Sequence, residues 1–114
     1  MKVEEFAKHL ERKCEELGFS KPRIIRRGFS FIKLQIQVDF ETTMEMYFNQ
    51  ESGTLTSALI AGGKRVFGIN GYPKDNEWHR HPLGEAERHL KTTPLALEEL
   101  LKEYHEVLRS LGKV

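Results

Sequence analysis

Cysteine is almost absent from this chain, and its absence limits how the protein can be held together. The only cysteine is Cys14, so no disulfide can form within the chain. It lies in the apolar stripe of a predicted helix, where a thiol normally serves as a small buried hydrophobe rather than as a nucleophile. A protein without disulfides fits a reducing compartment, so we expect a cytoplasmic location.

Long apolar runs and an excess of one charge are also missing. No stretch approaches the roughly 18 apolar residues of a membrane-spanning helix, and we expect no membrane partner. The 18 basic and 17 acidic residues give a formal net charge of +1, which provides no overall attraction to nucleic acid or lipid. Any such partner has to be attracted by a local patch. The length of 114 residues predicts a single domain, residues 1–114.

Helical periodicity is clear at both ends of the chain. Apolar residues recur three and four positions apart over residues 2–17, and Gly18 can supply a left-handed cap. Near the other end, Thr93 and Pro94 form a helix start that a leucine-rich stripe follows. These patterns predict helices over residues 2–17 and 94–111.

Between residues 23 and 70 the period changes to two. Apolar and polar residues alternate over residues 32–40, as in a strand with one buried face and one solvent face. Gly62-Gly63 marks a tight hairpin turn. The region predicts a meander of four or five antiparallel strands. The predicted fold class is therefore α+β, with the N- and C-terminal helices packed on one face of the sheet.

Residues 71–93 show no steady period, and we interpret them as a loop. Loops of about 20 residues are uncommon in small domains and are often functional. This one contains His79, His81 and His89. Imidazoles titrate near neutral pH, so such histidines can divide proton removal and proton donation between them.

Cleavage of RNA through its own 2′-hydroxyl needs that division of roles. One group takes the hydroxyl proton, another protonates the departing oxygen, and a cation stabilises the charged phosphorus centre. Arg80, or Arg65 on the neighbouring strand, is a candidate for the cation. Trp78 and Tyr72 are candidates for stacking on an unpaired base.

Two other interpretations of the histidines stay open. In an extended segment, residues two apart point the same way, so His79 and His81 can share a metal ion that His89 completes as a third ligand. No CxxC or HExxH motif accompanies them. Alternatively, all three are surface residues of a loop that Trp78 anchors on the core.

A basic stripe is the second feature with a possible function. Between Gly18 and Val38 no acid occurs, and there are five cations: Lys21, Arg23, Arg26, Arg27 and Lys33. Such a stripe attracts phosphate groups. Strict alternation places Arg23 and Arg27 on one face, so we assign these two to nucleic-acid binding. The same charges also suit a solvated edge strand that resists aggregation.

One segment resembles a known family. Arg65 to Asn70, the run Trp78-His79-Arg80-His81-Pro82, His89 and the helix near Leu95 resemble the TumE-type toxins. These are small partners in bacterial and archaeal toxin–antitoxin pairs. The resemblance implies a ribonuclease toxin with a cognate antitoxin.

The leading hypothesis is therefore a toxin that cleaves RNA by histidine acid–base chemistry without a metal or other cofactor. Its expected partners are RNA and an antitoxin protein. The first alternative is a non-enzymatic module that binds RNA or protein, and the second is a zinc-dependent hydrolase.

Overall fold

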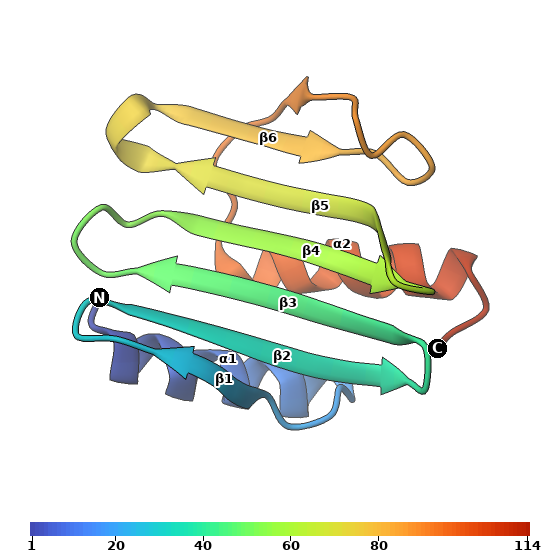
Figure 1. Ribbon diagram of the computed structural model, residues 1–114, viewed down its shortest axis with the longest axis horizontal. Coiled ribbons are helices and arrows are strands. Elements are labelled where there is room, and N and C mark those ends of the chain that lie inside the picture. The colour runs from blue at the N-terminus through green and yellow to red at the C-terminus, as the bar shows by residue number, and fades with distance from the viewer.

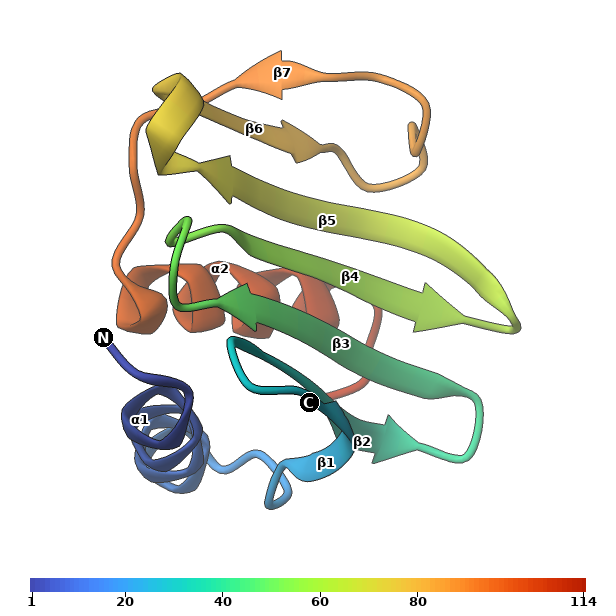
Figure 2. The ribbon, with the colours of Figure 1, turned by 60° about the vertical axis from the view of Figure 1, so that its left-hand side comes forward.

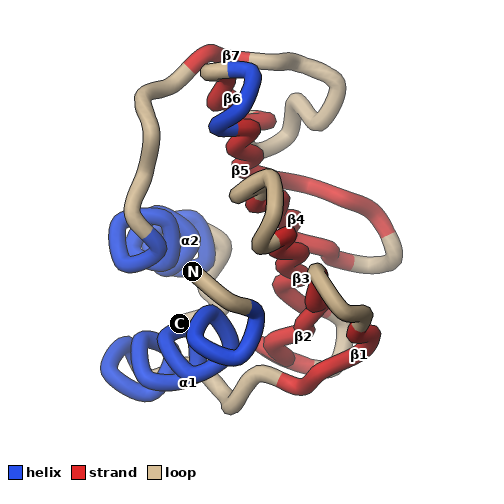
Figure 3. Tube along the Cα trace, turned by 90° about the vertical axis from the view of Figure 1, so that its left-hand side faces the viewer, coloured by secondary structure: helices blue, strands red, loops and turns tan.

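The computed structural model describes residues 1–114 and has an α+β fold. A single antiparallel sheet contains seven strands in the order in which they occur along the chain. The two helices lie side by side on one face of this sheet, as Figures 1 and 3 show. The predicted fold class is confirmed, but the prediction of four or five strands is wrong.

The helices are α1 (Val3–Leu17) and α2 (Leu97–Ser110). The strands are β1 (Arg23–Arg27), β2 (Phe31–Asp39), β3 (Thr42–Asn49), β4 (Leu55–Ala61), β5 (Lys64–Tyr72), β6 (Glu77–His81) and β7 (Leu90–Lys91), and a 3₁₀ turn, η1, spans Pro73–Asp75. Neither helix combines the length and the apolar character that a membrane crossing requires.

The alternating pattern of the strands divides the sheet into two faces. Ile32, Leu34 and Ile36 of β2 are buried beneath the helices, together with Met44 and Met46 of β3. The intervening polar residues lie on the opposite side, which we call the open face. One side of the sheet therefore builds the core and the other is left for solvent or a ligand.

The core lies between the sheet and the helices. Nineteen buried hydrophobic residues form one cluster, to which both helices contribute. Tyr104 of α2 is fully buried, and its hydroxyl donates a hydrogen bond of 2.9 Å to Ser57 Oγ on β4. Its ring also meets Phe67 of β5 edge-on, at 5.1 Å between centroids. Tyr104 thus joins α2 to the middle of the sheet.

The segment predicted as a loop over residues 71–93 contains further sheet. Strand β5 continues to Tyr72, and after the turn η1 the chain returns as β6, which pairs with β5. Strand β7 then adds two residues at the edge, as Figure 2 shows. The sequence of β6 lacks apolar alternation because the charged Arg80 joins Trp78 on the helix side, while His79 and His81 face the other side. Pairing with β5 decides the structure here, not apolar alternation.

The boundaries of the helices also differ from the prediction. Helix α2 begins at Leu97 rather than at residue 94, because Ala96 is still extended and its N–H donates a 3.0 Å hydrogen bond to Glu99 Oε1. Pro94 lies in the connection that leads from β7 to α2. Helix α1 begins one residue later than predicted and ends at the predicted residue.

Candidate functional site

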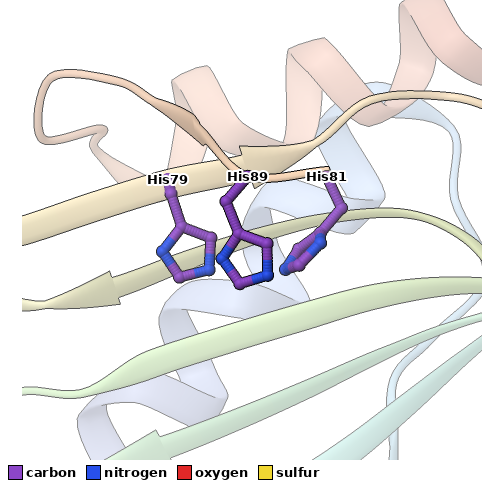
Figure 4. A group of neighbouring side chains, drawn as sticks. All are labelled: His79, His81 and His89. Atoms are coloured by element: carbon purple, nitrogen blue, oxygen red, sulfur yellow. The ribbon is translucent and has the colours of Figure 1, made fainter. Parts of the chain in front are cut away.

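Three histidines come together on the open face. His79 and His81 belong to β6, and His89 directly precedes β7. One nitrogen of each ring lies within 4.8 Å of those of the other two. The ring centroids are 4.4 Å apart for His81 and His89, and 4.7 Å apart for His79 and His89. Figure 4 shows the rings side by side, projecting in the same direction. We call these three residues the histidine cluster.

Pairing between β5 and β6 positions two members of the cluster. His79 lies opposite Asn70 and His81 lies opposite Gly68, so both side chains rise from the open face. A Cβ at position 68 would lie 2.9 Å from the Ser57 carbonyl oxygen and 3.7 Å from His81 Cδ2. The missing side chain of Gly68 therefore lets the Ser57 carbonyl lie close to β5, while the His81 ring is at ordinary van der Waals distance.

A hydrogen bond to the backbone orients the ring of His81. Its Nδ1 lies 2.7 Å from the carbonyl oxygen of Ala86. Because a carbonyl only accepts, we assign the proton to Nδ1, which leaves the lone pair of Nε2 free. Burial lowers the pKa of His81, and the positive charge of Arg65 and the other two histidines lower it further, although the bond to Ala86 opposes the shift. A neutral imidazole with an oriented Nδ1–H is the usual form of a metal-ligating histidine.

His79 is buried with one nitrogen unsatisfied. Asn70 accepts a 3.2 Å hydrogen bond from the Ser57 N–H through Oδ1, which turns its amide nitrogen toward His79 Nε2 at 3.4 Å. Nδ1 of His79 makes no hydrogen bond, although Glu77 Oε1 lies 3.4 Å away. A buried ring nitrogen without a partner is unusual unless a ligand or ion completes it.

The segment that carries His89 folds back over the sheet. The carbonyl oxygen of Ala86 accepts both the bond from His81 and a 2.9 Å hydrogen bond from Arg65 Nη2. Gly84 N–H donates to the Val66 carbonyl at 3.3 Å. We call residues 82–89 the covering loop. His89 itself is exposed, so it is the member of the cluster with the most freedom to move.

A shallow groove of about 380 Å³ lies beside the cluster on the open face. Arg65, Asn70 and Tyr72 line it on the cluster's side, with Lys33 and Tyr47 farther along the sheet. The ring of Tyr72 stacks on that of His79, at 5.9 Å between centroids and 26° between planes. The predicted residues Arg65 and Tyr72 therefore do lie with the histidines.

Arg80 and Trp78 do not join them. Both residues face the helix side, because they alternate with the histidines along β6. Arg80 Nη2 pairs with Glu103 Oε1 of α2 at 2.5 Å, and the indole of Trp78 lies over Gly71, where a Cβ would come within 2.4 Å of the ring. Of the two arginines considered for the cation, Arg65 therefore lies on the side of the histidines and Arg80 does not, and Trp78 lies on the opposite side of the sheet from them.

The basic stripe is also divided differently from the prediction. Strand β1 has a bulge between Ile24 and Arg26, so strict alternation fails there. Arg23 and Arg26 lie opposite Gln35 and Lys33 on the open face, whereas Arg27 lies opposite Ile32 on the helix side. Arg27 bonds to Glu4 of α1. The prediction that Arg23 and Arg27 share one face is therefore wrong, because Arg26 shares the open face with Arg23.

Three contributions to the site were missed in the sequence: the Asn70 amide, the Ala86 carbonyl and the space at Gly68. Asn70 and Gly68 alternate with Ile69 in β5, so a paired β6 would have placed both of them below the histidines. Nothing in the sequence marks the Ala86 carbonyl, because any residue supplies one. The other two histidines lie elsewhere: His105 on α2 meets Phe19 edge-on, and His9 is on α1.

No protein-family model, curated protein or solved structure matches this chain. The resemblance to TumE-type toxins therefore stays a prediction, and the functional argument depends on the geometry of the open face.

Proposed function

We propose that the histidine cluster binds a divalent transition metal of the Zn²⁺ class and that the protein uses the ion to hydrolyse an anionic substrate on the open face. One observation carries the proposal: three imidazole nitrogens from His79, His81 and His89 lie within 4.8 Å of one another. Three neutral histidines and a water molecule are a common ligand set of catalytic zinc.

The distances fit such an ion after a small movement. Nitrogens that bind one tetrahedral zinc at about 2.0–2.1 Å lie roughly 3.4 Å apart. The exposed His89 can supply the movement, while β6 and the bond from His81 to Ala86 hold the other two rings. With three protein ligands, a fourth position is left for water, whose pKa a zinc ion lowers toward neutrality.

The charge of the open face favours an anionic substrate. Arg65 lies beside His81, and Lys33 lines the groove that begins at the cluster. Lys33 is paired with Glu45, the only acid of the groove, at 3.7 Å. Arg23 and Arg26 lie on the same face but on β1, five strands from β6. Of these cations, Arg65 is the one placed to hold a phosphate or carboxylate near the metal, because β5 is the neighbour of β6.

Metal titration tests the proposal directly. Purified protein, stripped with chelator, should bind one equivalent of Zn²⁺ in competition with a chromophoric chelator. His89→Asn should weaken binding by about 10- to 100-fold, because one ligand is lost, while the melting temperature without metal should stay unchanged since His89 is exposed. His105→Asn, on α2, is the matched control. Equal zinc affinity in the wild type and in His89→Asn would refute a cluster-bound metal.

The second candidate is the metal-free RNA cleavage expected from the sequence. The position of Arg65 beside His81 favours it, since a cation next to a neutral imidazole suits attack on a phosphodiester. The stacked Tyr72 adds a surface for an unpaired base. In this mechanism His81 accepts the 2′-hydroxyl proton, and His89, the exposed member, donates to the departing oxygen.

Chelation separates the two candidates. RNA cleavage that survives EDTA and follows a bell-shaped pH profile supports the metal-free mechanism, whereas loss with EDTA and recovery with Zn²⁺ supports the hydrolase. The toxin role implied by the resemblance predicts growth arrest on expression, relieved by His81→Asn. Metal or RNA binding without turnover would instead indicate the binding module.

A further inference from the structure

Strand β1 forms an open edge of the sheet. It pairs only with β2, and all five of its residues are exposed. Figure 3 shows no element beyond it on its outer side. The outward N–H and C=O groups of an edge strand can pair with a further strand. At the opposite edge, β7 has only two residues, so β1 offers the longer template.

The surface beside this edge contains apolar side chains. A groove of about 540 Å³ lies between α1 and β1, and Ala7, Ile24 and Leu34 contribute its apolar lining. Ile24 is 49% exposed, and Phe29, in the turn after β1, is 92% exposed. An added strand would cover this groove with the side chains that it turns toward α1.

The charges of β1 indicate which kind of strand fits. Arg23 bonds to the neutral Gln35, and Arg26 lies 5.8 Å over the ring of Phe31. Neither arginine has a carboxylate partner, in contrast to Arg27, which bonds to Glu4. A second copy of the chain would bring arginine next to arginine, which is unfavourable across a pair of strands. An acidic segment would neutralise both.

We propose that β1 accepts an extended, acidic segment of a partner protein as an eighth strand of the sheet. In such a segment acidic and apolar residues alternate. Its acids reach Arg23 and Arg26 on the open face, and its apolar residues cover Ile24 and the groove against α1. Backbone hydrogen bonds supply the affinity and the alternating side chains supply the specificity. This inference does not depend on the metal proposal.

A defined peptide provides the probe: four Glu-Val repeats, acetylated, amidated and labelled for fluorescence anisotropy. We expect saturable binding to the wild-type protein. In hydrogen exchange, the amides of residues 23–27 should slow in the complex. Replacing Arg23 and Arg26 together by Gln should weaken binding by about tenfold, as expected for two exposed charge pairs. The matched control replaces Lys102 and Arg109, two exposed cations of α2, by Gln.

Three results would overturn the inference. The first is equal binding of a Lys-Val peptide, which would remove the charge argument. The second is binding that persists when alternate amides of the Glu-Val peptide are N-methylated on the edge that faces β1, which would exclude strand addition. The third is a wild-type dimer that the Arg-to-Gln pair strengthens, which would make a second copy the occupant. Zinc affinity, measured in parallel, should be the same in all of these variants, so the two proposals can fail separately.

Discussion

At the scale of single residues, two glycines of β5 decide what can lie over the end of the sheet. Gly68 lets the Ser57 carbonyl lie close to β5 at the position opposite His81, and Gly71 makes room for the indole of Trp78 on the helix face. Both positions would otherwise carry a Cβ in close contact with a neighbour. The same strand therefore accommodates a candidate site on one side and a core aromatic on the other.

Gly68→Ala should disturb the histidine cluster. The new Cβ would lie 2.9 Å from the Ser57 carbonyl oxygen, so β5 has to shift at the position that pairs with His81. We expect a loss of about 1–3 kcal/mol in the free energy of unfolding and weaker zinc binding. Gly71→Ala is the control: it should lose comparable stability by displacing Trp78 but keep its zinc affinity. Chemical denaturation and zinc titration measure the two effects, and unchanged affinity in Gly68→Ala would argue against this role.

Replacing Arg80 and replacing Arg65, the two candidates for the cation, should have opposite effects on stability and activity. Arg80→Met breaks the pair with Glu103 and should cost about 1–2 kcal/mol of stability while sparing zinc binding and activity. Arg65→Met removes the cation beside the cluster and should impair binding of an anionic substrate, seen as a raised KM, with a smaller effect on stability. If Arg80→Met lost activity at full stability, the placement of Arg80 on the helix side would be wrong.

At the scale of elements, β6 and the covering loop act together. Strand β6 pairs with β5 along its whole length and with β7 at two residues, whereas the loop is attached mainly by the two bonds to the Ala86 carbonyl and by Gly84. A metal ion would join the strand to the loop through His89. The loop is therefore the element whose mobility should respond to the ion.

Zinc should slow hydrogen exchange in the covering loop. We expect the amides of residues 83–89 to gain protection when Zn²⁺ is added, because local opening of the loop would then require breaking a metal bond. The amides of β3, in the middle of the sheet, should change little and serve as the internal control. In His89→Asn the added protection should vanish. Protection spread evenly over the whole chain would instead indicate general stabilisation.

At the scale of the whole molecule, the C-terminus is tied back to the sheet. Lys113 Nζ lies 2.8 Å from Asp39 Oδ2, at the end of β2, and 3.0 Å from Glu41 Oε1, in the turn that follows. The hydrogen bond from Lys113 lowers the pKa of Asp39, although burial opposes the shift. The pair thus connects the end of the chain with the far end of the β2–β3 hairpin.

This tie should make stability depend on pH in the acid range. A carboxyl whose pKa is lowered by folding binds fewer protons in the folded state, so its stabilisation is present above its ordinary pKa of 3.8 and is lost as the pH falls through the lower folded value. Asp39→Asn should flatten the decline of stability in that range, as followed by thermal melts. Glu106→Gln, which removes a remote acid paired with Arg109, should leave the decline unchanged.

Several features were predictable from the sequence because they depend on short-range patterns. Helical periodicity identified α1 and α2, and strict alternation identified β2 and its buried side. The cluster residues His79, His81 and His89 were also recognised together. The strand that carries His79 and His81 was not predicted. Strand β6 lacks apolar alternation, and it forms because β5 supplies its hydrogen-bond partners.

The amino-acid sequence by itself determined the fold class and the residues that form the core, since apolar periodicity states which side of each element must be buried. The tertiary structure decided which polar residues meet. A bulge in β1 places Arg26 on the open face and Arg27 on the helix side. Pairing between β5 and β6 places Arg65 near the histidines and Arg80 on the opposite face. Such choices depend on register between strands, where a shift of one residue exchanges the two faces.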